Sequence, residues 1–384
     1  MAIASVYGDL LRVPAVRRQT LSSVVAQVTQ TVAVGIALVV HGSTGSLAAG
    51  GVAAAAFALG VCVARPAQGR ALDRRGVRPV LVGCALGHAA ALCALAVAAP
   101  GGNAPALDVL ALLCGLSLPP ISQAMRAEWG RSIEPAARSA AFSLATIAQE
   151  LAVFGGPLLL AVVIAASSPR AAVAVLGLVA CVGSIGFALS LPAAASDAEA
   201  AERPGRRVAG ALLALVAVSF LLGSALGAVQ VSVAAVATEH TQPALAGLLI
   251  AAMSVGGLAG GLTYGAVRSG SAAAADLVGA LVLLTAAAVV LALVGSVPAT
   301  AALLFAVGLG LNPAITAITL QVRELGGGAE GFGWLSAGTG SGTALGAALA
   351  GYAAQRAGDP GPGFAVAAGS CALGLALVWV SPRR

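Results

Sequence analysis

The sequence contains no lysine, and it has few charged residues of any kind. Only 9% of its 384 residues are charged, whereas 59% are hydrophobic. A soluble domain carries about a quarter charged residues, so water is not the main solvent of this chain. A Walker A loop needs a lysine to contact the nucleotide phosphates. The lack of lysine therefore excludes an ATP-driven pump within this chain.

Cysteine and histidine are also sparse. All six cysteines fall inside apolar segments, which predicts reduced thiols packed among helices rather than a disulfide framework. The three histidines form no cluster with cysteine or acidic residues at metal-ligand spacing. The net charge of +6 comes from arginines in short loops, which argues against a nucleic-acid surface. We predict no metal and no cofactor.

Long apolar runs make up most of the sequence. A helix needs about 20 apolar residues to cross the hydrocarbon core of a bilayer. Twelve segments are predicted to do so: Thr20–Val40, Leu47–Ala64, Val80–Ala99, Ala106–Met125, Ser139–Ala165, Ala171–Leu191, Val208–Ala237, Ala244–Val267, Ala275–Gly295, Thr300–Val322, Gly331–Ala354 and Phe364–Val380. We call them spans 1 to 12. They predict an all-α polytopic membrane protein.

Arginine is distributed unequally between alternate loops. If the N-terminus is inside, the inner segments hold 18 of the 20 arginines, and the outer loops hold only Arg170 and Arg356. Positively charged loops stay on the cytoplasmic side of a membrane. We therefore expect both termini in the cytoplasm and the spans in the plasma membrane.

A polar stretch over residues 192–207 divides the twelve spans into two sets of six. We predict an N-terminal half over 1–191, a cytoplasmic linker over 192–207 and a C-terminal half over 208–384. Two patterns recur in both halves. Leu118-Pro119-Pro120 in span 4 corresponds to Leu311-Asn312-Pro313 in span 10, and the pairs Phe142/Gly156 and Phe332/Gly346 share the same spacing. These repeats indicate an internal duplication.

The segment between spans 2 and 3 carries a charged motif, R-P-A-Q-G-R-A-L-D-R-R-G-V-R-P, from Arg65 to Pro79. Its members Gly69, Asp73, Arg74, Gly76 and Arg78 match the pattern G-x-x-x-D-R-x-G-R-R, although Val77 stands where arginine is usual. The chain thereby resembles the major facilitator superfamily, over essentially its whole length. The resemblance implies two six-helix halves that move around a substrate site near the middle of the membrane.

The resemblance also implies a cytoplasmic gate. Asp73 is expected near the N-terminus of span 11, at Glu330, because a helix dipole attracts negative charge there. Gly69 would let the two helices approach. Because Glu330 is itself acidic, Arg74 or Arg78 is expected to bridge the two carboxylates. Arg70 and Arg75 are expected to be solvated.

Glu150 is the one acid that falls in the middle third of a predicted span. It lies roughly 16 Å into span 5, where a charge costs about 2.5–3.5 kcal/mol. A carboxyl group at this depth can take a proton from one side and release it to the other. Glu150 is therefore our candidate for proton coupling. The alternative is a protonated side chain that serves packing alone.

Gly156 and Pro157 follow Glu150 in the stretch F-G-G-P. This stretch resembles the core of the span 5 motif of drug–proton antiporters, although Ala152 and Leu160-Ala161 replace three of its glycines. Pro157 frees a backbone carbonyl and is expected to bend the helix. A bend without a part in coupling is an equal alternative.

Arg126, at the end of span 4, is not expected to pair with Glu150, because about 18 Å separates them along the helix axis. Two interpretations stay open. Arg126 contributes to the cytoplasmic gate, or it anchors span 4 at the lipid headgroups beside Trp129.

Polar residues in the apolar spans predict a central cavity. In span 1 they share one helical face, and the resemblance places spans 1, 4, 7 and 10 around the cavity. The candidates for substrate contact are Gln27, Gln30, Thr31, Gln123, Gln230, Asn312, Thr316 and Thr319. For each of them, hydrogen bonding between helices is the alternative. With one buried acid and no central arginine, we expect a neutral, cationic or amphipathic substrate rather than a polyanion.

Together these features predict a secondary active transporter that exports a small organic compound in exchange for protons. The proton gradient supplies the energy, and we expect a monomer in the bilayer with no obligatory protein partner and no nucleic acid. The alternatives are a facilitator or importer without proton coupling and, more remotely, a polytopic membrane enzyme. No catalytic cluster is found at membrane depth to favour the enzyme.

Overall fold

The computed structural model describes residues 3–101, 103–191, 206–267 and 273–380. All regular structure within these ranges is helical. Most of the linker predicted over 192–207 lies outside the described residues. So do the side chains of a few helical residues, among them Gln30 and Phe154.

The N-terminal half consists of nine α-helices and two short 3₁₀ helices within the described ranges. They are α1 (Ile3–Arg12), α2 (Pro14–Gln27), η1 (Val28–Thr31), α3 (Val32–Thr44), α4 (Leu47–Arg75), α5 (Val77–Ala98), α6 (Ala104–Ser117), α7 (Ile121–Ser132), η2 (Pro135–Ala137), α8 (Arg138–Ala166) and α9 (Pro169–Leu189). The C-terminal half contains α10 (Arg206–Glu239), α11 (Pro243–Val267), α12 (Ala273–Leu291), α13 (Val297–Glu324), α14 (Ala329–Ala357) and α15 (Gly361–Val380).

Eleven stretches of the described chain are long and apolar enough to cross a membrane. The predicted span 11 corresponds to α14, which has 29 residues but is rich in glycine, serine and threonine. Three of its glycines, Gly338, Gly342 and Gly346, lie directly on the backbone of α10. A Cβ atom at Gly338 would lie 2.9 Å from the carbonyl oxygen of Val216. Small residues allow membrane helices to pack this closely.

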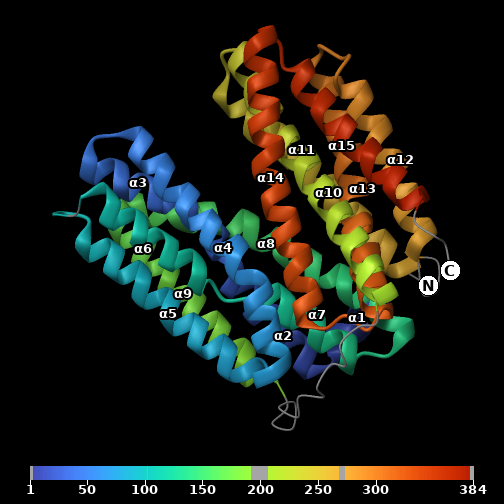
Figure 1. Cartoon of the computed structure of the whole chain (residues 1–384), viewed down its shortest axis with the longest axis horizontal. Helices are drawn as coiled ribbons and strands as arrows, with labels where there is room; N and C mark the ends of the chain where they lie inside the picture. The colour runs from blue at the N-terminus through green and yellow to red at the C-terminus, as the bar shows by residue number, and fades with distance from the viewer. Residues whose placement is uncertain (1–2, 102, 192–205, 268–272, 381–384) are drawn as a thin grey trace.

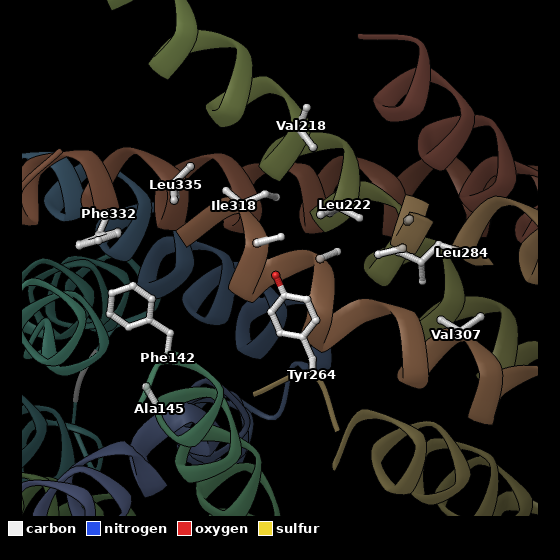
Figure 2. Close-up of a cluster of buried hydrophobic side chains, with 14 of the residues drawn as sticks. Phe142, Ala145, Val218, Leu222, Tyr264, Leu284, Val307, Ile318, Phe332 and Leu335 are labelled. Atoms are coloured by element: carbon white, nitrogen blue, oxygen red, sulfur yellow. The ribbon is translucent and has the colours of Figure 1, made fainter. Parts of the chain in front are cut away.

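The two halves form separate bundles that meet at one end and diverge toward the other (Figure 1). The main contacts between them are α4 with α14 and α8 with α11. We call the end that contains Asp73 and Glu330 the closed end, and the opposite end the open end. Phe142 and Phe332, the repeated phenylalanines, belong to one cluster of buried side chains near this junction (Figure 2).

Two of the predicted spans are broken helices. Span 1 consists of α2, η1 and α3, and its 3₁₀ turn lies against Gly156 of α8, where a Cβ atom would lie 2.7 Å from Oγ1 of Thr31. Span 4 consists of α6 and α7, which are separated at Leu118-Pro119-Pro120. Two consecutive prolines remove two backbone donors and stop the helix.

The motif between spans 2 and 3 is mostly helical rather than a loop. The helix α4 continues from the membrane to Arg75, and α5 begins at Val77. Only Gly76 separates the two helices, with a φ of 81°, a conformation that glycine adopts without strain. Gly76 therefore makes the sharp turn between spans 2 and 3.

Candidate functional site

The carboxylate of Asp73 joins the two halves at the closed end. Its Oδ1 accepts a hydrogen bond from the backbone N–H of Ala329 at 2.8 Å, and its Oδ2 accepts one from Glu330 at 2.8 Å. These are N–H groups of the first turn of α14, which have no partner within their helix. The dipole of α14 also favours a negative charge there. The expected contact is present, and its part in gating stays a prediction.

Gly69 lies one turn before Asp73 and makes this contact possible. A Cβ atom at this position would lie 2.7 Å from the Cα of Glu330 and closer still to the carbonyl oxygen of Ala329. The backbones of α4 and α14 therefore touch here. Any larger residue would push the two halves apart.

The arginine that reaches Glu330 is Arg70, not Arg74 or Arg78. Arg70 donates to Oε1 of Glu330 from Nη2 at 2.7 Å and from Nε at 3.0 Å. Arg78 instead donates to the carbonyls of Ala188, at 3.1 Å, and Leu191 within the N-terminal half. The reason is position: Arg70 adjoins Gly69 on α4, whereas Arg78 lies beyond the Gly76 turn on α5. Arg74 is exposed.

Two further contacts across the closed end involve residues that the sequence analysis did not select. The first comes from α1, an amphipathic helix before span 1. The hydroxyl of Tyr7 donates to the carbonyls of Gly261 and Leu262 in α11, both at 3.1 Å. Burial raises the pKa of Tyr7 to about 12. The sequence feature that could have predicted this contact is the helical spacing of Val6, Leu10 and Leu11, which all pack on the core.

The second contact is made by Arg323 at the end of α13. Its Nε donates to the carbonyl of Gly130 in α7 at 3.0 Å. Its side chain lies over Gly130, where a Cβ atom would lie 3.0 Å from Cδ of Arg323. This contact ties span 10 to span 4.

Glu150 lies above the closed end, at the junction of the two halves. It is partly buried in α8, and its carboxyl group interacts with the side chain of Asn312 in α13. The Nδ2 of Asn312 donates to the carbonyl of Gly257 in α11 at 2.8 Å, and its Oδ1 is buried without a hydrogen-bond partner. Glu150 therefore meets a polar group from the opposite half.

Sequence and structure comparisons agree with this architecture. The family model described as Major Facilitator Superfamily matches residues 20–234. The chain belongs to the Major Facilitator Superfamily. No curated protein sequence matches it significantly.

Solved structures of transporters share the fold. The human organic anion transporter MFSD10 is 18% identical with a TM-score of 0.74, and the match covers 94% of this chain and 99% of that one. The E. coli fucose:proton symporter FucP is 14% identical with a TM-score of 0.75, and the match covers 97% of this chain and 99% of that one. A bacterial homologue of the iron transporter ferroportin, in an outward-facing state, is 15% identical with a TM-score of 0.76, over 95% and 99%.

As a member of the superfamily, the protein is a multi-pass membrane transporter rather than an enzyme. The polar candidates for its cavity fall into two groups. Gln27 and Thr319 have partners within their own half: Gln27 accepts from Ser122 at 2.6 Å, and Thr319 donates to the carbonyl of Ile315 at 2.8 Å. Thr31 is buried against Gly156. For these three residues, substrate contact stays a prediction beside hydrogen bonding between helices.

The other group has unmet hydrogen-bonding capacity. Both polar atoms of the Gln123 side chain are buried without partners, as is Oγ1 of Thr316. Gln230 is exposed on α10, and the side chain of Gln30 lies outside the described residues. Gly156 permits the close approach of span 5 to span 1, and Pro157 lies within the continuous helix α8.

The structure excludes one of the two interpretations of Arg126. Trp129 is fully buried, and its Nε1 donates to Oε1 of Gln19 at 2.6 Å. The end of span 4 is therefore packed inside protein, and Arg126 does not anchor it at headgroups beside Trp129. The Nε of Arg126 is buried without a partner.

The break in span 4 is stabilised by two motif residues that the sequence analysis passed over. Nε2 of Gln68 donates to the carbonyls of Leu116 and Leu118, both at 3.0 Å. Nη1 of Arg65 lies 3.3 Å from the carbonyl oxygen of Pro119. Both side chains come from α4, so the motif helix donates hydrogen bonds to the carbonyls at the break.

Proposed function

We propose that the protein exports a small organic compound across the plasma membrane in exchange for protons, by alternating access, with both termini in the cytoplasm. The observation that carries the proposal is the arrangement of the halves, which are joined at the closed end and diverge at the other (Figure 1). The arginine distribution assigns the closed end to the cytoplasm. The described conformation is then outward-facing, ready to release substrate and accept a proton.

Glu150 is the proposed proton carrier. When the halves close over it, an ionised carboxylate would be buried at high cost, whereas a neutral carboxylic acid needs only a hydrogen-bond acceptor. Oδ1 of Asn312, which is buried and has no partner, can be that acceptor. Protonation from the outside therefore permits the return to the inward-facing state. Release of the proton inside restores the carboxylate for the next cycle.

The test is a compound-extrusion panel in cells that lack their own exporters. Wild type is compared with Glu150→Gln and with the control Glu239→Gln, which neutralises an exposed acid at the end of α10, at matched membrane abundance. We expect Glu150→Gln to abolish extrusion driven by the pH gradient while compound binding persists. The control should extrude as wild type does.

Other outcomes would replace the proposal. If Glu150→Gln extrudes compounds as well as wild type does, Glu150 is a packing residue, and no residue is left to carry the proton. If wild type equilibrates a compound without accumulating or extruding it, the protein is a facilitator. If the gradient drives uptake, it is an importer.

A further inference from the structure

A second polar region lies between Glu150 and the closed end, and it contains a cation without a counterion. Arg126 of α7 is at most partly exposed, and its Nε is buried with no hydrogen-bond partner. Among the described residues, no acid lies within ion-pair distance of it. Removing a charge from water without a partner is strongly unfavourable. An anionic partner that comes from outside the chain would remove this cost.

The neighbours of Arg126 on its helix fix the direction in which it faces. Ser122, Arg126 and Gly130 are four residues apart and therefore share one face of α7. The hydroxyl of Ser122 donates to Oε1 of Gln27 in span 1 at 2.6 Å. The carbonyl of Gly130 accepts from Arg323 of the other half at 3.0 Å. Arg126 lies between these two contacts, so it faces the junction of the halves.

The same contacts set its depth. Spans 4 and 10 both run toward the closed end, and they touch where Gly130 meets Arg323. At 1.5 Å per residue, Arg126 lies about 6 Å above that contact, and Asn312, the partner of Glu150, lies roughly 16 Å above it. Thr316 falls between them. The cation thus lies between the proposed proton carrier and the closed end.

Several other polar atoms of this region lack partners. They are Nε2 and Oε1 of Gln123, Oγ1 of Thr316 and Oδ1 of Asn312, all buried. Gln123 precedes Gly130 by seven residues and so shares its face of α7. Buried polar groups in proteins are almost always hydrogen-bonded. Several unmet groups on two facing spans, next to an unpaired arginine, are the features of a ligand site without its ligand.

We propose that Arg126 binds the anionic group of the transported compound, a small organic anion that carries a carboxylate or a phosphate ester. A guanidinium donates two parallel hydrogen bonds to such a group, and Gln123 and Thr316 supply further polar contacts. The inference rests on the proposed function and names its substrate class. It also reverses the expectation of a neutral or cationic substrate, which assumed that no arginine faces the centre.

The test measures binding to the purified full-length protein in detergent, with no proton gradient. Thermal unfolding is followed with compounds that share a ring but differ in charge: benzoate, phenyl phosphate, benzamide and benzylamine, together with the aliphatic pair succinate and succinamide. We expect one or both kinds of anion to raise the unfolding temperature of wild type, while their neutral and cationic counterparts do not. Comparing carboxylates with phenyl phosphate distinguishes the two anionic groups.

Variants assign the effect to Arg126. Arg126→Gln should weaken anion binding about tenfold or more, Arg126→Lys should retain part of it, and Gln123→Leu should reduce it independently. The control Arg170→Gln removes an equal charge at the exposed start of α9 and should bind as wild type does. Monodisperse elution of each variant shows that it is folded.

Three results would overturn the inference: stabilisation by neutral or cationic compounds instead of anions, equal anion binding by Arg126→Gln, or no stabilisation by any anion at millimolar concentrations. The proton coupling is judged separately. Because binding is measured without a gradient, Glu150→Gln should keep its anion response even where it has lost transport. The binding measurement therefore tests the anion site, and the transport measurement tests proton coupling, independently of each other.

Discussion

The two ends of the molecule are built differently. At the closed end, Asp73, Arg70, Tyr7 and Arg323 each make a polar contact across the halves. At the open end, the described helices end in caps of their own, such as Gly45, whose N–H donates to the carbonyl of His41 at 2.8 Å. The polar contacts between the halves described here thus lie at the closed end, beside the packing of α4 on α14 and of α8 on α11.

The contacts of the closed end also differ among themselves. Asp73 combines a buried helix terminus with a backbone-to-backbone approach at Gly69, whereas Arg70 and Glu330 form an ion pair with side chains 49% and 37% exposed. Exposed pairs contribute little. We therefore expect the preference for the described conformation to depend on the helix contact far more than on the ion pair.

The largest effect is expected from Gly69→Leu. The side chain would collide with the backbone of Ala329 and Glu330, and overpacking of this kind costs about 1–3 kcal/mol or more. Spin labels on α4 and α14 at the closed end should move apart, and transport should fall sharply. The matched control is Gly51→Leu on the same helix, where no atom lies within 4 Å. An unchanged label distance in Gly69→Leu would contradict the close approach.

The next effect is expected from Asp73→Asn. The amide keeps one acceptor oxygen but loses the charge and the second acceptor, so about 2 kcal/mol of preference for the joined state of the closed end should be lost. The same label distances should increase as the two halves separate at the closed end. Asp359→Asn is the control, because this acid lies at the open end and accepts a hydrogen bond from the nearby backbone N–H of Gly361 at 2.7 Å. Equal behaviour of the two variants would refute the role of Asp73.

A smaller effect is expected from Tyr7→Phe, which removes the hydroxyl bonded to α11, with a loss of about 1 kcal/mol. Burial raises the pKa of Tyr7 from 10.0 to about 12. The contact therefore contributes fully below pH 10 and is lost as pH rises from 10 to 12. Between pH 6 and 9 the difference between Tyr7→Phe and wild type should be constant. A steep change in that range would show that another group is involved.

The smallest effect is expected from Arg70→Gln. An exposed ion pair contributes about 0–1 kcal/mol and is screened by salt. The label distances should change little at low ionic strength and not at all at high salt. Arg12→Gln breaks another exposed pair, with Asp9 at 2.8 Å inside α1, and serves as the reference. A loss in Arg70→Gln as large as in Asp73→Asn would reverse the ranking of these contacts.

Much of the fold could be predicted because eleven of the twelve predicted spans are apolar runs that suit a membrane helix. The contact of Asp73 with α14 was also predictable, since the motif and the helix terminus are both visible in the sequence. The choice of Arg70 over Arg78 was not, because it depends on where α4 ends and which way each side chain points. The apolar run that predicts span 2 ends at Ala64, but the helix α4 continues to Arg75.

The candidate site was predicted less completely. The depth of Glu150 followed from its position in an apolar run. Its partner Asn312 belongs to the other half of the chain, and no feature of the sequence near Glu150 indicates this pairing. The break at η1 contains neither glycine nor proline, and it coincides with the approach of Gly156 from α8. Arg126 was expected near the cytoplasm from its position in span 4, and its direction is inferred only from the contacts of Ser122 and Gly130 on the same face of α7.

The composition of α14 bears on how the protein is made. A segment with so many glycines, serines and threonines gains little free energy by moving alone from the translocon into lipid. Its small residues become favourable only when another helix covers them, as α10 does along its length. Because α10 is synthesised first, it is available in the membrane when α14 emerges. We therefore expect the insertion of α14 into the membrane to depend on α10, which precedes it in the chain and packs against it.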